Sequence, residues 1–178
     1  YLTGQIHLNA TQYPDEKSQV LFYQKLQNVL NTIPGSDRSA ITTSTVGQFT
    51  VPQQVDVDSS TVNSRDKWAY PLVNDVQVMP GSLSGMGIKA VTGREFAFSD
   101  DSDSQPVVVV SQSFLSQYWP GEKDVIGKRL RLRNAEDPRW YSVIGVVPDV
   151  IHGRPFSTFR HRATAVSYTH LRAHETGA

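Results

Sequence analysis

The chain has 178 residues, which suits one domain or two small lobes and is long enough to bury a core. Its 17 Lys and Arg residues balance its 17 Asp and Glu residues, and the lack of a basic excess argues against a general nucleic-acid-binding protein. The absence of cysteine excludes disulfides, thiol catalysis and thiolate metal sites. No apolar run is long enough to predict a membrane span, and the first residue, Tyr1, suggests a fragment of a longer protein.

The N-terminal part predicts a strand, a helix and a second strand. Residues 1–8 alternate as a strand does, with Leu2, Ile6 and Leu8 on one face. Pro14 suits the first turn of the helix, and Pro34 with Gly35 ends it. The apolar residues between them recur at helical spacing and form one stripe: Phe22, Leu26, Val29 and Ile33. Residues 39–46 are rich in β-branched side chains and predict the second strand.

A second strand–helix–strand unit is predicted further along. Residues 47–70 lack helical periodicity and predict short strands or an extended loop. Residues 72–78 predict a strand, residues 80–87 allow only a short helix, and residues 88–96 predict another strand with Ile88 and Ala90 or Val91 facing inward. Two such units in series are typical of a split βαβ fold of the ferredoxin type.

The third part begins after a break of turn-forming residues at 98–106. Four consecutive valines, 107–110, indicate a buried central strand. Ser111 or Ser113 is expected to cap a helix whose apolar face is aromatic, and Pro120 with Gly121 ends it. Residues 128–133 then alternate with leucines inward and arginines outward, and residues 140–147 predict the partner strand of a hairpin. The apolar face of the helix comprises Phe114, Leu115, Tyr118 and Trp119. On the strand, the inward residues are Leu130 and Leu132, and the outward residues are Arg129, Arg131 and Arg133.

The order of these landmarks resembles a known family. An apolar strand and an aromatic helix are followed by Trp119-Pro120-Gly121, then Ile126-Gly127-Lys128, a basic strand, and the segment from Val143 to Val147 with Asp149-Val150 behind it. Earlier landmarks agree: Tyr13-Pro14-Asp15, Pro80-Gly81, Met86-Gly87-Ile88 and Thr92-Gly93-Arg94. From about Leu2 to about Pro155 the chain resembles the MacB-like periplasmic core domain of ABC transporter permeases of the MacB and FtsX type.

The resemblance implies an α+β domain outside the inner membrane, held by flanking transmembrane helices and moved by a separate cytoplasmic ATPase. It implies a ferredoxin-like porter lobe of two strand–helix–strand units and a smaller α/β second lobe. We expect the first lobe at residues 1–97, with residues 47–70 open to packing on the second lobe, and the second lobe at 98–165. A periplasmic adaptor protein is a further candidate partner, and a dimer is expected only in the full transporter. No catalysis, cofactor, metal or nucleic-acid partner is implied.

The resemblance ends near the C-terminus. Residues 166–178 resemble translated adapter or vector sequence and are predicted to be a non-native tail that contributes little to the fold. Within it, His170 and His174 lie four residues apart, as zinc ligands on a helix do, but Leu171 replaces the glutamate of that motif. Asp100, Asp101 and Asp103 suggest a calcium loop, yet Pro106 and Gln112 stand where glycine and a bidentate glutamate are needed. A solvated turn is the simpler interpretation.

Two further patterns allow a functional and a structural interpretation. Arg129, Arg131 and Arg133 suit phosphate or acidic lipid headgroups, although outward charges on a strand need no ligand. Asp149 with His152 suits a general acid–base pair and Ser111 a nucleophile, but no oxyanion device accompanies them. The sequence therefore favours the extracytoplasmic domain of a permease that couples motion to transport, with exposed contacts in residues 48–66. The alternatives are a soluble ferredoxin-like module that binds a small ligand between its lobes, and an enzyme.

Overall fold

The computed structural model describes residues 2–9, 11–34, 39–43, 52–58, 72–100, 104–133, 139–149 and 163–168. The three helices are α1 (Glu16–Thr32), α2 (Ser82–Gly85) and α3 (Gln112–Tyr118). The seven strands are β1 (Pro52–Val57), β2 (Leu72–Val78), β3 (Thr92–Gly93), β4 (Val107–Ser111), β5 (Arg129–Leu132), β6 (Trp140–Val147) and β7 (Thr164–Tyr168). No helix in these ranges is both long and apolar enough to span a bilayer.

The strands form a small barrel, because their pairings run in a closed circuit. The order is β3-β6-β4-β7-β2-β1-β5. Because β5 also pairs with β6, the six strands from β6 to β5 in this order form a closed ring. The circuit is mixed: β2–β7 and β4–β6 are parallel, whereas β1–β2, β1–β5, β4–β7 and β5–β6 are antiparallel. Only β3 stands outside the circuit, as an antiparallel addition to β6. Within the circuit each of the other six strands has two neighbours, which leaves less unpaired edge than an open sheet would have.

Two core clusters lie on opposite faces of the central strands. In β4, Val108 and Val110 belong to the first cluster and Val107 and Val109 to the second, so the strand is buried on both faces. The first cluster also receives α3, through Phe114 and Trp119. The second is covered by Leu83 of α2 and the turn before it, and Tyr23 of α1 packs against it from outside. Both faces of β4 are buried, so no position on it faces water. This explains why four consecutive valines replace the usual alternation of apolar and polar residues.

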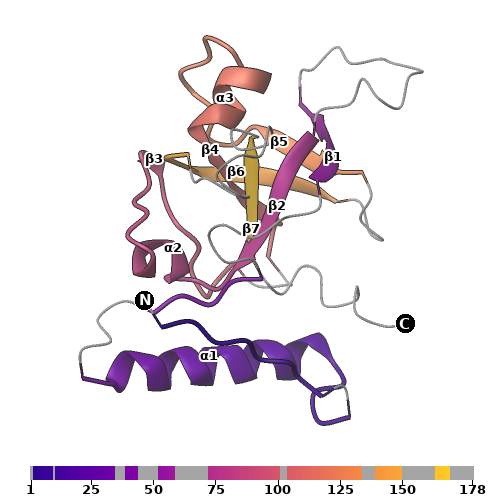
Figure 1. Ribbon diagram of the computed structural model, residues 1–178. Coiled ribbons are helices and arrows are strands. Elements are labelled where there is room, and N and C mark those ends of the chain that lie inside the picture. The colour runs from indigo at the N-terminus through magenta and orange to yellow at the C-terminus, as the bar shows by residue number, and fades with distance from the viewer. Residues whose placement is uncertain are drawn as a thin grey trace.

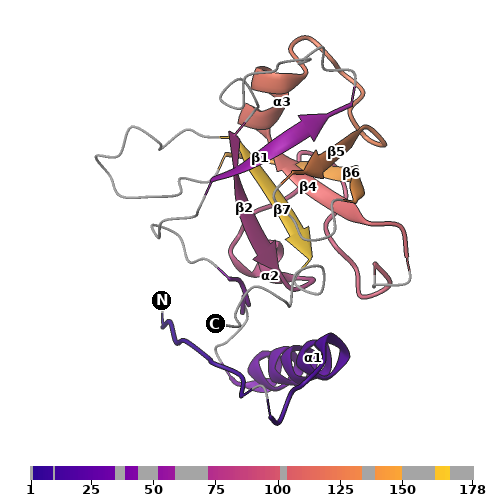
Figure 2. The ribbon, with the colours of Figure 1, turned by 90° about the vertical axis from the view of Figure 1, so that its right-hand side faces the viewer.

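Helix α1 lies at the end of the barrel that carries α2, whereas α3 lies at the other end (Figures 1 and 2). Asp15 caps α1, its carboxylate accepting a hydrogen bond from the Ser18 N–H at 2.8 Å. Among the α1 residues whose side chains the structure describes, Gln27 alone is buried. The predicted stripe is only partly covered, because Val29 and Ile33 remain 59% and 49% exposed.

Most of the elements predicted for residues 72–147 are confirmed. Strand β2 and helix α2 occur where the sequence places them, and β4 is the buried central strand that the valines indicate. Ser111 caps α3, and β5 and β6 form the predicted hairpin pair. Leu130 and Leu132 of β5 face the first core cluster.

Several predicted strands are wrong. Residues 2–8 form no strand, and Leu2 and Ile6 are exposed, because alternation alone supplies no partner strand. In residues 39–46, the described part makes only one bridge, Thr42 with Val78. The strand predicted over 88–96 is reduced to β3, with Ala90 and Val91 exposed, although Ile88 packs against the second core cluster. The fold is α+β, but the described residues do not show two ferredoxin-like strand–helix–strand units.

The barrel crosses the boundary predicted at residues 98–106. Strands β1, β2 and β3 precede it and β4 to β7 follow it, yet all belong to one sheet. Helix α1 contacts the 72–95 region, through a hydrogen bond from Gln27 to the Pro80 carbonyl at 2.8 Å. The division into lobes at 1–97 and 98–165 stays a prediction.

The C-terminal strand β7 corrects the prediction for the tail. It lies between β2 and β4 in the middle of the sheet, and Val166, Ser167 and Tyr168 are at most 4% exposed. The expectation that residues from 166 onward contribute little is therefore wrong for these three. The foreign origin of residues 166–178 stays a prediction, and residues 169–178 lie outside the described part.

Candidate functional site

The serine proposed as a nucleophile holds two elements together. Ser111 ends β4 and is 2% exposed, and its hydroxyl oxygen accepts hydrogen bonds from the Phe114 N–H at 3.3 Å and the Thr164 N–H at 3.0 Å. Its hydroxyl also shares a hydrogen bond with that of Ser113, at 2.9 Å. Because these contacts cap α3 and tie it to β7, the geometry of Ser111 is that of a structural residue.

The proposed acid–base pair is divided. Asp149 accepts a hydrogen bond from the Ser113 N–H at 2.7 Å and so adds a second cap to the start of α3. A carboxylate suits that position because the first N–H groups of a helix lack backbone partners. The other member, His152, lies outside the described residues, as do His170 and His174 of the zinc hypothesis.

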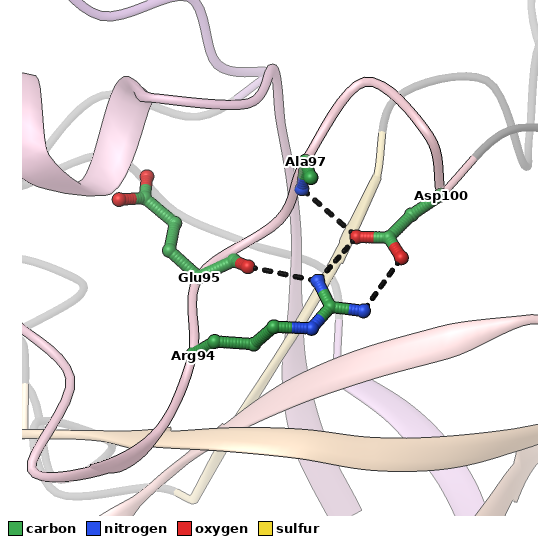
Figure 3. A network of polar contacts seen from close by, with 4 residues as sticks. All are labelled: Arg94, Glu95, Ala97 and Asp100. Carbon is green, nitrogen blue, oxygen red and sulfur yellow. Dashed lines mark hydrogen bonds and ion pairs between the residues drawn. The ribbon is translucent and has the colours of Figure 1, made fainter.

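Asp100, the first residue of the calcium hypothesis, belongs to a clip that closes the turn after β3 (Figure 3). Its two carboxylate oxygens each accept a hydrogen bond of 2.7 Å from the Arg94 guanidinium, and one also accepts the Ala97 N–H at 2.8 Å. The same guanidinium donates to the Glu95 carbonyl at 3.1 Å. The paired carboxylate, first by hydrogen bonding, raises the pKa of Arg94 above its ordinary value.

The clip depends on a glycine across the sheet. A Cβ at Gly145 of β6 would overlap the Arg94 carbonyl, so only glycine permits this close approach. The clip also continues into α2, because Glu95 accepts hydrogen bonds from the Leu83 N–H at 2.9 Å and the Ser84 hydroxyl at 2.5 Å. The carboxylates of Asp100 and Glu95 are thus engaged by protein donors. Asp101 and Asp103 lie outside the described residues, and within the described ranges no group of three or more His, Cys, Asp or Glu side chains suits a metal.

The outward arginines in and directly after β5 form a ladder with aspartates in and directly after β1, the strand beside it. Arg131 and Arg133 bind the two oxygens of Asp56 at 2.7 and 2.6 Å, and Arg129 contacts Asp58 at 3.3 Å. Partial burial acts to raise the pKa of Asp56, but the hydrogen bonds and charges of Arg131 and Arg133 outweigh it and leave that pKa below its ordinary value. The ladder gives the three arginines partners within the protein.

An aromatic ring supports the same ladder from β6. The guanidinium carbons of Arg129 and Arg131 lie 5.5 and 5.1 Å from the ring centroid of Trp140. The ladder therefore fastens β1, β5 and β6 on their outer face and is built as a structural feature. Sequence reasoning found the arginines but missed Asp56 and Asp58, although the alternating Val-Asp-Val-Asp at 55–58 carries the signal.

The contact region predicted at residues 48–66 is partly core. Strand β1 occupies its middle, and Val55 and Val57 are 0% and 4% exposed within the first core cluster. The expectation of exposed contacts in residues 48–66 is therefore wrong for these positions. The rest of that region, residues 48–51 and 59–66, lies outside the described part.

Three solved structures show similarity to this chain. The periplasmic region of MacB from Actinobacillus actinomycetemcomitans aligns with a TM-score of 0.52 at 21% identity, over 85% of this chain and 57% of that one. A domain of a putative permease protein from Porphyromonas gingivalis aligns with a TM-score of 0.49 at 18% identity, over 80% of this chain and 54% of that one. The extracellular domain of the noncanonic ABC-type transporter YknZ from Gram-positive bacteria gives 0.46 at 13% identity, over 79% and 59%.

The chain thus spans little more than half the length of these structures. The comparison with curated proteins gave no significant match. The family of the MacB-like periplasmic core domain matches residues 8–177, nearly the whole chain. This chain belongs to the family of MacB-like periplasmic core domains, the extracytoplasmic domains of ABC transporter permeases of the MacB and FtsX type.

Proposed function

We propose that this periplasmic domain acts mechanically, coupling ATP-driven movement of membrane helices to export or extraction of a substrate. The observation that carries the proposal is that groups which the sequence offers for chemistry are used to hold the fold. Ser111 and Asp149 cap α3, Asp100 closes the clip, and the β5 arginines bind Asp56 and Asp58. A domain built in this way suits the transmission of a displacement between rigid parts.

The architecture supports this proposal through its contrast in burial. The barrel has central strands buried on both faces, whereas the described contacts of α1 with it are one buried side chain, Gln27, and the partly buried Tyr23. A stiff body with a weakly attached helix can change the angle between the two at low cost, as hinge and shear motions require. The partners that we propose are the flanking transmembrane helices, a cytoplasmic ATPase and a periplasmic adaptor protein, with dimerisation in the full transporter.

The test compares two activities of the full-length permease. A coupling domain predicts that cross-linking α1 to the barrel leaves ATP hydrolysis measurable but stops substrate transport. The chain contains no cysteine, so cysteines introduced at Gln27 of α1 and Pro80 after β2, where the Gln27 side-chain nitrogen lies 2.8 Å from the Pro80 carbonyl oxygen, can be joined selectively by a short thiol cross-linker. The same pair without the cross-linker, and each single cysteine, are the controls. Transport that continues at the rate of the unlinked pair after complete cross-linking would refute the coupling role.

A further inference from the structure

The contact between α1 and the barrel combines Tyr23, which packs on the second core cluster, with a buried polar group whose hydrogen bonding is incomplete. Gln27 is 5% exposed; its amide nitrogen donates to the Pro80 carbonyl at 2.8 Å, while its Oε1 has no hydrogen-bond partner in the described structure. A buried polar atom without a partner opposes the closed arrangement, because water would satisfy it on opening. The contact is therefore specific in geometry and yet easily released.

The chain returning from α1 is fastened to the same turn. Ile41 exchanges hydrogen bonds with the Ser82 hydroxyl, at 2.9 and 3.0 Å, and its carbonyl accepts the Met79 N–H at 3.0 Å. Thr42 then bridges to Val78, the last residue of β2. Gln27 of α1 and residues 41–42 of the returning chain thus all contact residues 78–82, at the end of β2 and in the turn and helix that follow it.

One glycine makes this approach possible. A Cβ at Gly85 would overlap the carbonyl oxygen of Ser39, and the Ser39 hydroxyl in turn contacts the Asn31 side chain near the end of α1 at 2.7 Å. Because Gly85 has an ordinary helical backbone, its need for glycine comes from this neighbour and not from its own dihedral angles. The close approach of Ser39 to α2 therefore requires a residue without a side chain at position 85.

We propose that these contacts, Gln27 with Pro80 and Ser39 with Gly85, form a releasable joint through which displacement of α1 reaches β2 and the barrel. The joint has a docked state, in which both contacts are made, and an undocked state, in which Gln27 is hydrated and α1 is displaced. It rests on the proposed coupling function for its purpose, but its existence can be tested separately.

The test measures the position of α1 relative to the barrel in the 178-residue chain. Cysteines introduced at Lys25 of α1 and Gln117 of α3, both exposed and at opposite ends of the molecule, carry spin labels for pulsed dipolar distance measurement. The parent should give one dominant distance. Gly85→Ala pushes Ser39 away, and Gln27→Glu replaces the donor to Pro80 with a carboxylate. Each variant should lower the fraction of molecules at the parental distance and add a second population at a different distance.

Two matched variants control for composition. Gly4→Ala makes the same change where a Cβ meets nothing within 4 Å, and Asn28→Asp makes the same amide-to-carboxylate change on the exposed neighbour of Gln27. Both should keep the parental distance. If Gly85→Ala fails to fold, as judged by near-ultraviolet circular dichroism, Gln27→Glu alone decides the outcome.

Parental distances in the folded joint variants would overturn the inference, and so would a broad distribution in the parent itself. The full-length permease separates this result from the proposed function. If the distances change and transport falls while ATP hydrolysis continues, both stand. If the distances change and transport is unaffected, the joint stands and the coupling role is refuted.

Discussion

Trp119 fills the core beneath the end of α3. Its ring lies 5.2 Å from that of Phe114, centroid to centroid, and its indole N–H donates to the Asp58 carbonyl at 3.2 Å. We expect Trp119→Ala to lower the free energy of unfolding by about 3–5 kcal/mol, because it leaves a cavity and removes the donor to that carbonyl. Urea denaturation measures this loss.

The control for that variant is the second described tryptophan. Trp140 is 36% exposed, and its ring stacks with the arginines of the ladder. Trp140→Ala should therefore cost about 0.5–1 kcal/mol for each cation–π interaction that it removes. Equal losses in the two variants would contradict the assignment of Trp119 to the core.

Asp56 should make the ladder sensitive to acid. Its pKa in the folded protein lies below the 3.8 of an unperturbed aspartate, so its charged form stabilises the fold above that pH. The stabilisation is lost as the pH falls through the lowered folded value, because the unfolded chain then binds the proton more readily. The difference in unfolding free energy between the parent and Asp56→Asn should therefore be steady near neutrality and shrink below about pH 5. Chemical denaturation at a series of pH values measures it, and a difference that is constant into acid would count against the ladder.

At the scale of elements, Ser111 connects α3 with β7. Ser111→Ala removes an N-cap, which costs about 0.5–2 kcal/mol. It also removes the side-chain acceptor of the buried Thr164 N–H, which costs about 1–3 kcal/mol more. Ser116→Ala on the exposed side of α3, where the hydroxyl bonds to the carbonyl of Gln112 in the same helix, is the comparison and should change stability little. Thermal unfolding of both variants checks this. Hydrolysis of ester substrates that requires Ser111 would instead support the enzyme hypothesis.

Elements whose residues carry a local signal could be predicted from the sequence. The four valines of β4, the alternation of β5 and the Ser111 cap each report burial or a helix start within a few residues. The strand expected over residues 1–8 failed because alternation says which side chains share a face but not whether a partner strand exists. Strand β3 is short for a related reason, since its pairing with β6 extends no further than the backbone hydrogen bonds from Val91 and Arg94 on either side of it.

The sites were predicted less well than the elements. The Thr164 N–H that binds Ser111 and the Ser113 N–H that binds Asp149 come from parts of the chain far away in sequence. Asp100 binds the nearby Arg94, but the spacing alone does not show that the two side chains face each other. The importance of Gln27 carries no local signal, because a glutamine on a helix is ordinary until its neighbour Pro80 is known. The burial of single polar residues such as Gln27 could therefore not be predicted from the sequence.

At the scale of the whole molecule, the barrel depends on β7. Tyr168 is 1% exposed and its ring lies 6.3 Å from that of Phe96 in the second core cluster. We expect a chain that ends at Ala163 to lose cooperative unfolding, because β2 and β4 then lack their shared partner. Removal of residues 169–178 alone, which lack a periodic pattern, should change stability by only about ±0.5 kcal/mol. Urea titrations followed by circular dichroism distinguish the two, and a cooperative transition in the shorter chain would contradict the role of β7.

The place of β7 also fixes when the domain can fold during synthesis. Asn74 of β2 pairs with Thr164, so β2 has no permanent neighbour on that side until most of the chain has been made. At the usual pace of about 5–20 residues per second, the wait is on the order of 10 s. Throughout it, the apolar side chains and open edges of β2 and β4 can form wrong pairings. A sheet whose central pairing waits for β7 is therefore open to mispairing for longer than one whose strands pair in the order of their synthesis.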